Sequence, residues 1–221
     1  MRAAVSGSGT SPSDAAGAVL VAAPLADSPL AAELFGAAEP VVVALDELRV
    51  ATAWEGRLFD LLAAACEPRP SESGLSGAPG AAPERRTVGL LVPLRWLGPG
   101  PAPDVVAVSD HLNARLRGPL TGRRPVSGPR ASAVQPFPSM TGVYQPETIA
   151  AACRSSVRRR VYSVSAVAGV TDAARLTPFE RRAVAAGACA AVCDCLVDAV
   201  VVAALHGLRV AAAGVPTAAN P

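Results

Sequence analysis

Residues 177–213 decide the fold, and they read TPFERRAVAAGACAAVCDCLVDAVVVAALHGLRVAAA. The stretch opens on Thr177 and Pro178, residue types that suit the N-cap and the first position of an α-helix. Glu180 follows Thr177 by three residues, which completes a capping box. A helix is therefore predicted to begin at this point of the chain.

Extended and helical patterns alternate through the rest of this stretch. Short apolar runs near 188–192 and over 208–213 predict two buried strands. Residues 195–205 between them predict a helix that Gly207 ends. Strands that alternate with helices are typical of a mostly parallel sheet with helices on its faces.

The same alternation continues outward toward the N-terminus. After an apolar run at 18–23, strands are predicted at 40–45, 87–92, 104–109 and 160–167, and helices at 28–35, 55–66 and 147–153. In the helix at 55–66, Leu58, Leu61 and Leu62 share one face, which predicts burial of that face.

The composition supports one folded domain. The chain has 221 residues, of which 51% are apolar and 17% charged, so it can build a core, and disorder of the whole chain is excluded. Two stretches rich in small residues, Pro and Gly, residues 1–17 and 67–84, are predicted to be disordered. The domain is therefore expected over 18–221, with 67–84 as an insert.

Charge and hydropathy exclude several classes of protein. A formal net charge of +2 is too small for the basic footprint of a nucleic-acid-binding protein. The N-terminal residues lack the apolar run of a signal peptide, and charged residues interrupt the most apolar stretch, 183–215. We therefore expect a cytoplasmic protein that contacts neither nucleic acid nor membrane.

The cysteines indicate core thiols. Five of them lie in apolar surroundings: Cys66, Cys153, Cys189, Cys193 and Cys195. An odd number in such positions favours reduced thiols over a disulfide framework. The spacing C-x3-C-x-C over 189–195 lacks the paired C-x2-C of zinc sites. The sequence thus predicts no metal and no cofactor.

Five segments of the chain follow one another in a distinctive order. They are DHLN at 110–113, LTGRRPVSGP at 120–129, FPSMTGVYQPE at 137–147, TPFERR at 177–182 and AVVVAALHGLRV at 199–210. This series resembles the purine nucleoside phosphorylase family, whose members carry DHxN, LTGxNPLxGPN, FPDMSDAYDPE, TPAEIR and EVIVARHAGLRV. The resemblance covers residues 87–217, and residues 18–66 more weakly.

The resemblance implies a phosphorylase-like fold: a single α/β domain with a mixed, largely parallel central sheet flanked by helices, assembling as a trimer. It also implies a reaction in which inorganic phosphate attacks C1′ of a purine nucleoside and releases free base and pentose 1-phosphate. This chemistry needs donors for phosphate, an acceptor for the purine ring and a partner for N7 as the glycosidic bond breaks.

The phosphate-binding positions implied by the resemblance carry unsuitable residues. The family's serines match Ala23 and Cys195 by position. Ala23 has no hydroxyl, and Pro24 beside it has no N–H to donate. A further phosphate element falls within Pro93–Gly98, where bulky side chains stand at positions that need close approach of the backbone.

The purine-binding positions implied by the resemblance are Leu176, Asp194 and Ala218. Leu176 stands where the family has a glutamate that accepts from the purine N1–H, and leucine cannot accept a hydrogen bond. Asp194 matches a methionine, and Ala218 matches the asparagine that serves N7. The family's last helix has no counterpart in the sequence, so the resemblance implies a C-terminally shortened homologue.

Three other residues have a structural interpretation. His111 is expected to fix a DHLN turn at a strand end together with Asp110. Tyr144 is expected to pack in a segment that the family uses near its subunit interface. His206 is expected to cap a helix and complement its dipole.

The substitutions at the phosphate-binding and purine-binding positions favour a pseudoenzyme. Such a homologue in nucleoside metabolism keeps the fold and has lost most or all phosphorolysis. It binds a ligand or forms oligomers, alone or with an intact relative. The alternative is an active divergent glycosyltransferase, either a phosphorylase with inorganic phosphate as co-substrate or a hydrolase, in which Asp194, Cys195 and Arg175 supply the chemistry. A barely stable product of a decaying reading frame is a third alternative.

Overall fold

A computed structural model gives the architecture of the chain. It describes residues 18–36, 40–44, 48, 57–66, 86–115, 138–156, 160–173 and 175–217. The predicted disordered stretches 1–17 and 67–84 lie outside the described residues, as does the LTGRRPVSGP segment at 120–129.

Strands and helices alternate along the described chain, as the sequence predicts. The strands are β1 (Ala18–Ala22), β2 (Val41–Val43), β3 (Thr87–Trp96), β4 (Val105–Asn113), β5 (Tyr162–Gly169), β6 (Cys189–Cys193) and β7 (Arg209–Pro216). The helices are η2 (Ala23–Leu25), α1 (Leu30–Phe35), α3 (Arg57–Cys66), α4 (Pro146–Ser155), α5 (Pro178–Ala186) and α6 (Leu196–Leu205).

The described strands form one mixed sheet in the order β2-β1-β3-β6-β5-β4-β7, and β7 pairs with β3 as well. The pairs β3–β6 and β4–β7 are antiparallel, and the others are parallel. Because β7 returns to β3, five strands close into a ring, and β1 and β2 extend it from β3. The single α/β domain and the mixed sheet are confirmed, but the expected largely parallel central sheet is wrong, because five of the strands curl into a mixed barrel.

Irregular pairing and a glycine accompany this closure. The register of β4 against β5 shifts between Val108 and Asp110, and such bulges increase the local twist and bend of a strand. Gly214 of β7 lies opposite Val106 of β4. A Cβ atom on Gly214 would overlap the side chain of Leu94, so glycine lets Leu94 fill this position between the strands.

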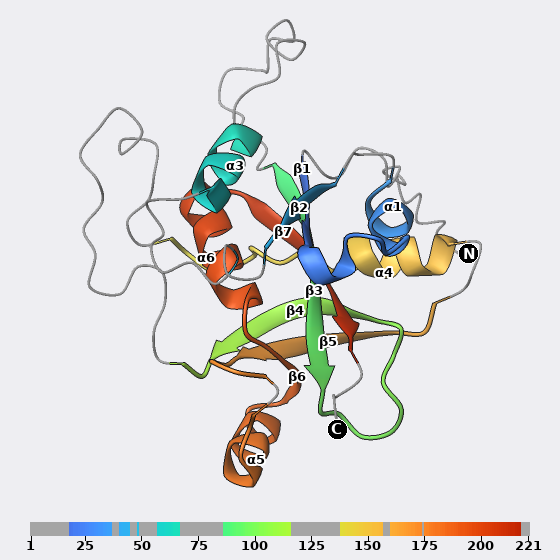
Figure 1. Cartoon of the computed structure of the whole chain (residues 1–221), viewed down its shortest axis with the longest axis vertical. Helices are drawn as coiled ribbons and strands as arrows, with labels where there is room; N and C mark the ends of the chain where they lie inside the picture. Colours follow the sequence, from blue (N-terminus) through green and yellow to red (C-terminus); the bar gives the residue numbers. More distant parts are fainter. Residues whose placement is uncertain are drawn as a thin grey trace, which may run out of the picture.

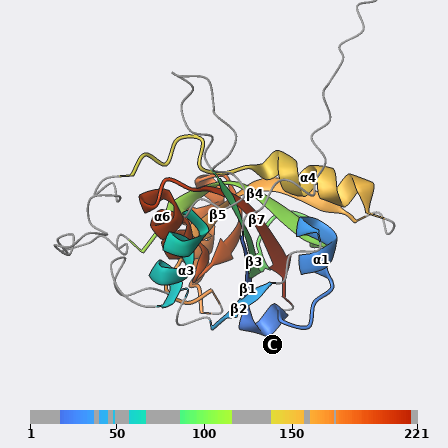
Figure 2. The same cartoon turned by 90° about the horizontal axis from the view of Figure 1, so that it is seen from above.

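Helices cover both faces of the sheet beside the barrel (Figure 2). Helices α1 and α4 pack on one face, where the buried apolar residues include Val19, Val21, Leu34, Leu91, Ile149 and Ala211. Helices α3 and α6 pack on the other, where the cluster includes Leu20, Leu58, Leu62, Leu90, Val92 and Val200. The predicted burial of Leu58 and Leu62 is confirmed.

Helix α5 stands apart from the other helices, at the lower end of the molecule in Figure 1. It begins with the predicted capping box: the Glu180 N–H donates to Oγ1 of Thr177 at 3.2 Å, and the Thr177 N–H donates to Oε2 of Glu180 at 2.7 Å. A small apolar cluster joins the helix to β5 and β6 through Ala168, Val184 and Cys189, and Leu176 belongs to it as well.

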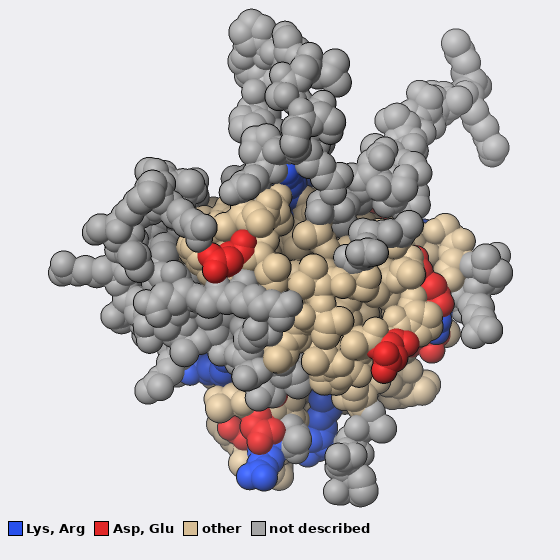
Figure 3. All heavy atoms as spheres, turned by 45° about the horizontal axis from the view of Figure 1, so that its top comes forward, with Lys and Arg blue, Asp and Glu red and all other residues tan. Residues whose placement is uncertain are grey.

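Charged side chains are sparse on the surface, as expected for a chain with 17% charged residues. Figure 3 shows the described Arg, Asp and Glu side chains in small separate groups, with wide uncharged areas between them. None of the helices in the described part of the chain is long and apolar enough to span a lipid bilayer.

Candidate functional site

The carboxyl ends of β4, β5 and β6 meet at one edge of the barrel and bring polar side chains together there. Asn113 of β4 lies opposite Gly169 of β5, and Gly169 lies opposite Cys193 of β6. His111 is two residues before Asn113, so it lies on the same side of β4. Ligands of α/β proteins bind outside the carboxyl ends of parallel strands, so this edge is the candidate site.

An uncharged pair of aromatic side chains lies along this edge. The Tyr144 hydroxyl oxygen is 2.9 Å from Nδ1 of His111, and the two ring centroids are 5.8 Å apart. Burial lowers the pKa of His111, and the charge of Asp110 opposes this in part. Burial also raises the pKa of Tyr144 far above its ordinary value. Both side chains are therefore neutral near pH 7.

The DHLN motif is the last part of a strand and not the expected turn. β4 continues to Asn113 because β5 offers hydrogen-bonding partners as far as Gly169. The expected link between the first two residues of the motif is confirmed, since the His111 N–H donates to Oδ1 of Asp110 at 2.7 Å.

A buried ion pair connects the residues after β4 to the start of α6. Nη2 of Arg115 contacts Oδ1 of Asp198, and the two side chains are only 15% and 4% exposed. Asp198 is the one charged residue fully buried among those the structure describes. Burial raises the pKa of Asp198, and the Arg115 charge opposes that rise. The carboxylate lies in the first turn of α6, where the helix dipole favours a negative charge.

The start of α6 covers the end of β5. A Cβ atom on Gly169 would overlap the side chain of Val197, so glycine is required for this close contact. Cys195, Leu196 and Val197 are 0%, 0% and 1% exposed. This part of the edge is therefore filled by the chain's own helix.

Two buried thiols lie side by side where β6 leads into α6. The Sγ atoms of Cys193 and Cys195 are 3.5 Å apart, and the Cys193 thiol donates to the Pro93 carbonyl oxygen at 3.2 Å. The Cys195 thiol and the backbone N–H groups of Cys195 and Leu196 lower the pKa of Cys193 against the effect of burial. The prediction that the cysteines are buried is confirmed for Cys153, Cys189, Cys193 and Cys195, which are also free of disulfides.

The predicted phosphate-binding positions differ in their surroundings. Ala23 begins η2 directly after β1 and is exposed. Cys195 is the N-cap residue of α6, makes no capping hydrogen bond with its side chain, and is fully buried. Pro93 and the bulky residues after it continue β3 as far as Trp96, so this segment is extended strand.

Two of the three predicted purine-binding positions lie in the described part of the chain. Leu176 packs into the apolar cluster beneath α5, whereas Cys195 belongs to the main core cluster with α6. Asp194 is half-buried beside Cys195. Ala218 lies outside the described residues. Asp194 and Cys195 are neighbours in the sequence, at the start of α6.

Sequence reasoning missed the Arg115–Asp198 pair. Asp198 is the only charged residue in the helix LVDAVVVAAL, and a single carboxylate in so apolar a helix signals a buried partner. Nothing in the sequence near Arg115 marks it as that partner, because 83 positions separate the two residues.

Comparisons with known proteins give matches among solved structures. No family model matches the chain, and no curated protein matches it. Isoform 2 of purine nucleoside phosphorylase from Schistosoma mansoni, in complex with cytosine and ribose-1-phosphate, is similar with a TM-score of 0.51 and 17% identity, over 59% of this chain and 47% of that chain. A Schistosoma purine nucleoside phosphorylase in complex with guanosine is similar with a TM-score of 0.51 and 16% identity, over 61% of this chain and 50% of that chain.

These matches show the fold. The chain has a purine nucleoside phosphorylase-like α/β fold, and it spans about half the length of the solved structures it matches.

Proposed function

We propose that this chain is a phosphorylase-like pseudoenzyme, which keeps the fold without phosphorolysis and acts by binding a purine nucleoside or base and by forming oligomers. The proposed assembly is a trimer of this chain or an association with an intact phosphorylase. In this proposal the protein needs no cofactor and acts in the cytoplasm. The observation that carries the proposal is the burial of Leu176 in an apolar cluster, at the position that matches the family's purine-binding glutamate.

The surroundings of the phosphate-binding positions support the same proposal. Ala23 offers no hydroxyl, and Cys195 is fully buried. Asp198 already places a negative charge in the first turn of α6. Asp198 pairs there with Arg115, and the residues around it are buried, so the chain's own side chains already fill the start of this helix. One missing donor to a developing negative charge costs about 10² to 10³ in rate.

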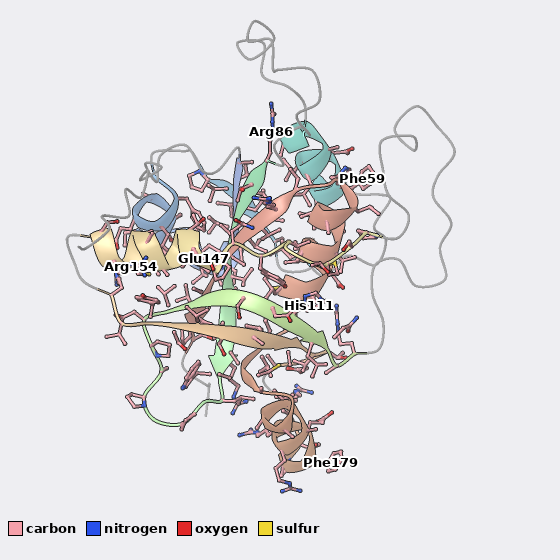
Figure 4. All side chains as sticks on the ribbon, turned by 180° about the vertical axis from the view of Figure 1, so that it is seen from behind. Phe59, Arg86, His111, Glu147, Arg154 and Phe179 are labelled. Atoms are coloured by element: carbon pink, nitrogen blue, oxygen red, sulfur yellow. The ribbon has the colours of Figure 1, made fainter. Side chains whose placement is uncertain are left out.

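An uncovered apolar area supports oligomer formation. Leu112 of β4 lies opposite Ala168 of β5, which the apolar cluster beneath α5 buries completely. Val164 lies on the same side of β5 as Ala168 and is 52% exposed, and Leu112 is 41% exposed. Phe179 is 71% exposed and projects from the far side of α5 (Figure 4). Exposed apolar side chains on β4, β5 and α5 are candidates for burial when the chain associates with a partner.

The experiment measures the mass and ligand binding of the purified chain. Light scattering is expected to show a trimer, or a complex when an intact phosphorylase is added, and Val164→Glu is expected to weaken it. Ala151→Glu is the matched control, because it adds the same charge at an exposed position of α4, away from α5. Guanosine or guanine is expected to raise the melting temperature. A monomer that binds neither an intact phosphorylase nor a purine contradicts the proposal.

The alternative is an active divergent phosphorylase or hydrolase, and one observation favours it. The hydrogen-bonded pair of His111 and Tyr144 lies at the carboxyl edge of the parallel strands, where a general acid or base would be useful. Arg175, which the sequence suggested for such chemistry, is 87% exposed and pairs with Asp172 at 3.5 Å. Phosphate-dependent release of base from a nucleoside would favour a phosphorylase, and release without phosphate a hydrolase.

A further inference from the structure

Cys193, Asp194 and Cys195 bring three metal-ligating atoms into one place. The two sulfurs and a carboxylate oxygen of Asp194 all lie within 4.8 Å of one another. We propose that these three residues bind a thiophilic divalent cation of the Zn²⁺ type. The site goes beyond the proposed function, and it does not depend on whether the chain cleaves or binds nucleosides.

The distance between the sulfurs suits a shared cation. Two thiolates held tetrahedrally by one Zn²⁺, each at about 2.3 Å, lie about 3.7 Å apart. The Sγ atoms of Cys193 and Cys195 are 3.5 Å apart in the protein. A disulfide would require them to approach to about 2.05 Å. A cation therefore fits with less movement than a covalent bond between the sulfurs.

Oxygen atoms complete the coordination. The Cys193 thiol now donates to the Pro93 carbonyl oxygen at 3.2 Å. On binding, the cation displaces both thiol protons to solvent, so each sulfur becomes a thiolate and the Pro93 carbonyl loses its donor. The Asp194 carboxylate oxygen is the third ligand, and water takes the fourth position, as in zinc sites with three protein ligands.

The position in the fold compensates the charge. Two thiolates and the Asp194 carboxylate exceed the charge of a divalent cation by one negative unit. The three residues directly precede α6, and Cys195 is its N-cap residue. The positive end of a helix dipole favours this excess negative charge.

The partial exposure of Asp194 gives the cation access to the site from solvent. Cys193 and Cys195 are 1% and 0% exposed, whereas Asp194 between them is half-buried. The carboxylate therefore forms the solvent side of the site, and the sulfurs form its shielded side. The sequence predicted no metal because C-x-C lacks the usual zinc spacing, but the change from strand to helix folds the two thiols toward each other.

The test uses the full chain, reduced and freed of metal with a chelator, and titrates it with Co²⁺ and then Zn²⁺. The expected result is a thiolate-to-cobalt charge-transfer absorption that Zn²⁺ abolishes. Cys195→Ala is expected to lower the affinity for Co²⁺ at least about 100-fold. Loss of a residue that only hydrogen-bonds to a metal ligand already lowers metal affinity about 10 to 100-fold. Cys189→Ala, a buried thiol of the same strand, is the matched control and is expected to bind as the unmodified chain does.

Asp194→Asn keeps the test decisive if removal of a buried thiol impairs folding. At this half-buried position the change is expected to leave the fold intact and to lower the affinity about 10-fold. Circular dichroism of each variant confirms that it is folded. The proposal is overturned if the unmodified chain shows no charge-transfer absorption, if Cys195→Ala binds unchanged, or if Cys189→Ala loses affinity equally.

Discussion

Arg115 holds the buried carboxylate of Asp198, and this ion pair fastens the end of β4 to the first turn of α6. The Nε atom of Arg115 is also buried and makes no hydrogen bond. The ion pair is therefore removed from water while one N–H group of Arg115 has no hydrogen-bond acceptor. Such a pair stabilises a fold weakly, but loss of one partner leaves an uncompensated charge in the interior.

Asp198→Ala is expected to lower the free energy of unfolding by about 3 to 5 kcal/mol, because Arg115 is left buried without its counter-charge. Urea denaturation followed by circular dichroism measures the change. The double variant Arg115→Met with Asp198→Leu removes both charges and is expected to recover most of the loss. A double variant as unstable as Asp198→Ala would show that the ion pair is not the cause.

Thr177→Ala is expected to lower the free energy of unfolding by about 1 kcal/mol, because α5 loses the hydroxyl that accepts the Glu180 N–H. Thermal unfolding measures the change. Thr177→Ser keeps the hydroxyl and is the matched control. If alanine and serine are equally stable, the capping box does not hold the helix end.

His206 makes stability depend on pH. His206 is the C-cap residue of α6, as expected. Burial lowers its pKa to about 4, so the side chain is neutral near pH 7. The expected interaction of a charged His206 with the helix dipole is therefore wrong. The unfolded chain binds this proton near pH 6.5, before the folded chain does. Stability from this group is therefore complete above about pH 6.5 and is lost as the pH falls toward 4.

The check is a series of urea denaturations between pH 7 and pH 4. His206→Gln cannot take up the proton, so its stability is expected to fall less steeply over this range. His111, whose pKa is lowered as well, gives a matched comparison through His111→Gln. Parallel curves for the unmodified chain and His206→Gln would contradict the assignment.

Gly169→Ala is expected to destabilise the protein by about 1 to 3 kcal/mol, because the added methyl group overlaps Val197 at the start of α6. Val197→Ala in the same chain makes room and is expected to restore part of the loss. Thermal melting measures both. Additive losses in the double variant would show that β5 and α6 do not meet at this point.

Local patterns predicted most elements of this fold but not its closure. The strand and helix alternation and the Thr177–Glu180 capping box depend on neighbouring residues, and both are confirmed. The barrel depends on β7 pairing with both β3 and β4, which are far away in the sequence. The same limit applies at the site, where Arg115 meets Asp198 across 83 positions.

The most direct measurement of the proposed loss of phosphorolysis is the release of free base from inosine or guanosine by the purified chain, with and without inorganic phosphate. Base is quantified over time at high protein concentration, and an intact phosphorylase serves as the positive control. With Leu176 buried and no hydroxyl at Ala23, we expect no release above the uncatalysed rate under either condition. Release that requires phosphate and scales with the concentration of this protein would contradict the pseudoenzyme assignment.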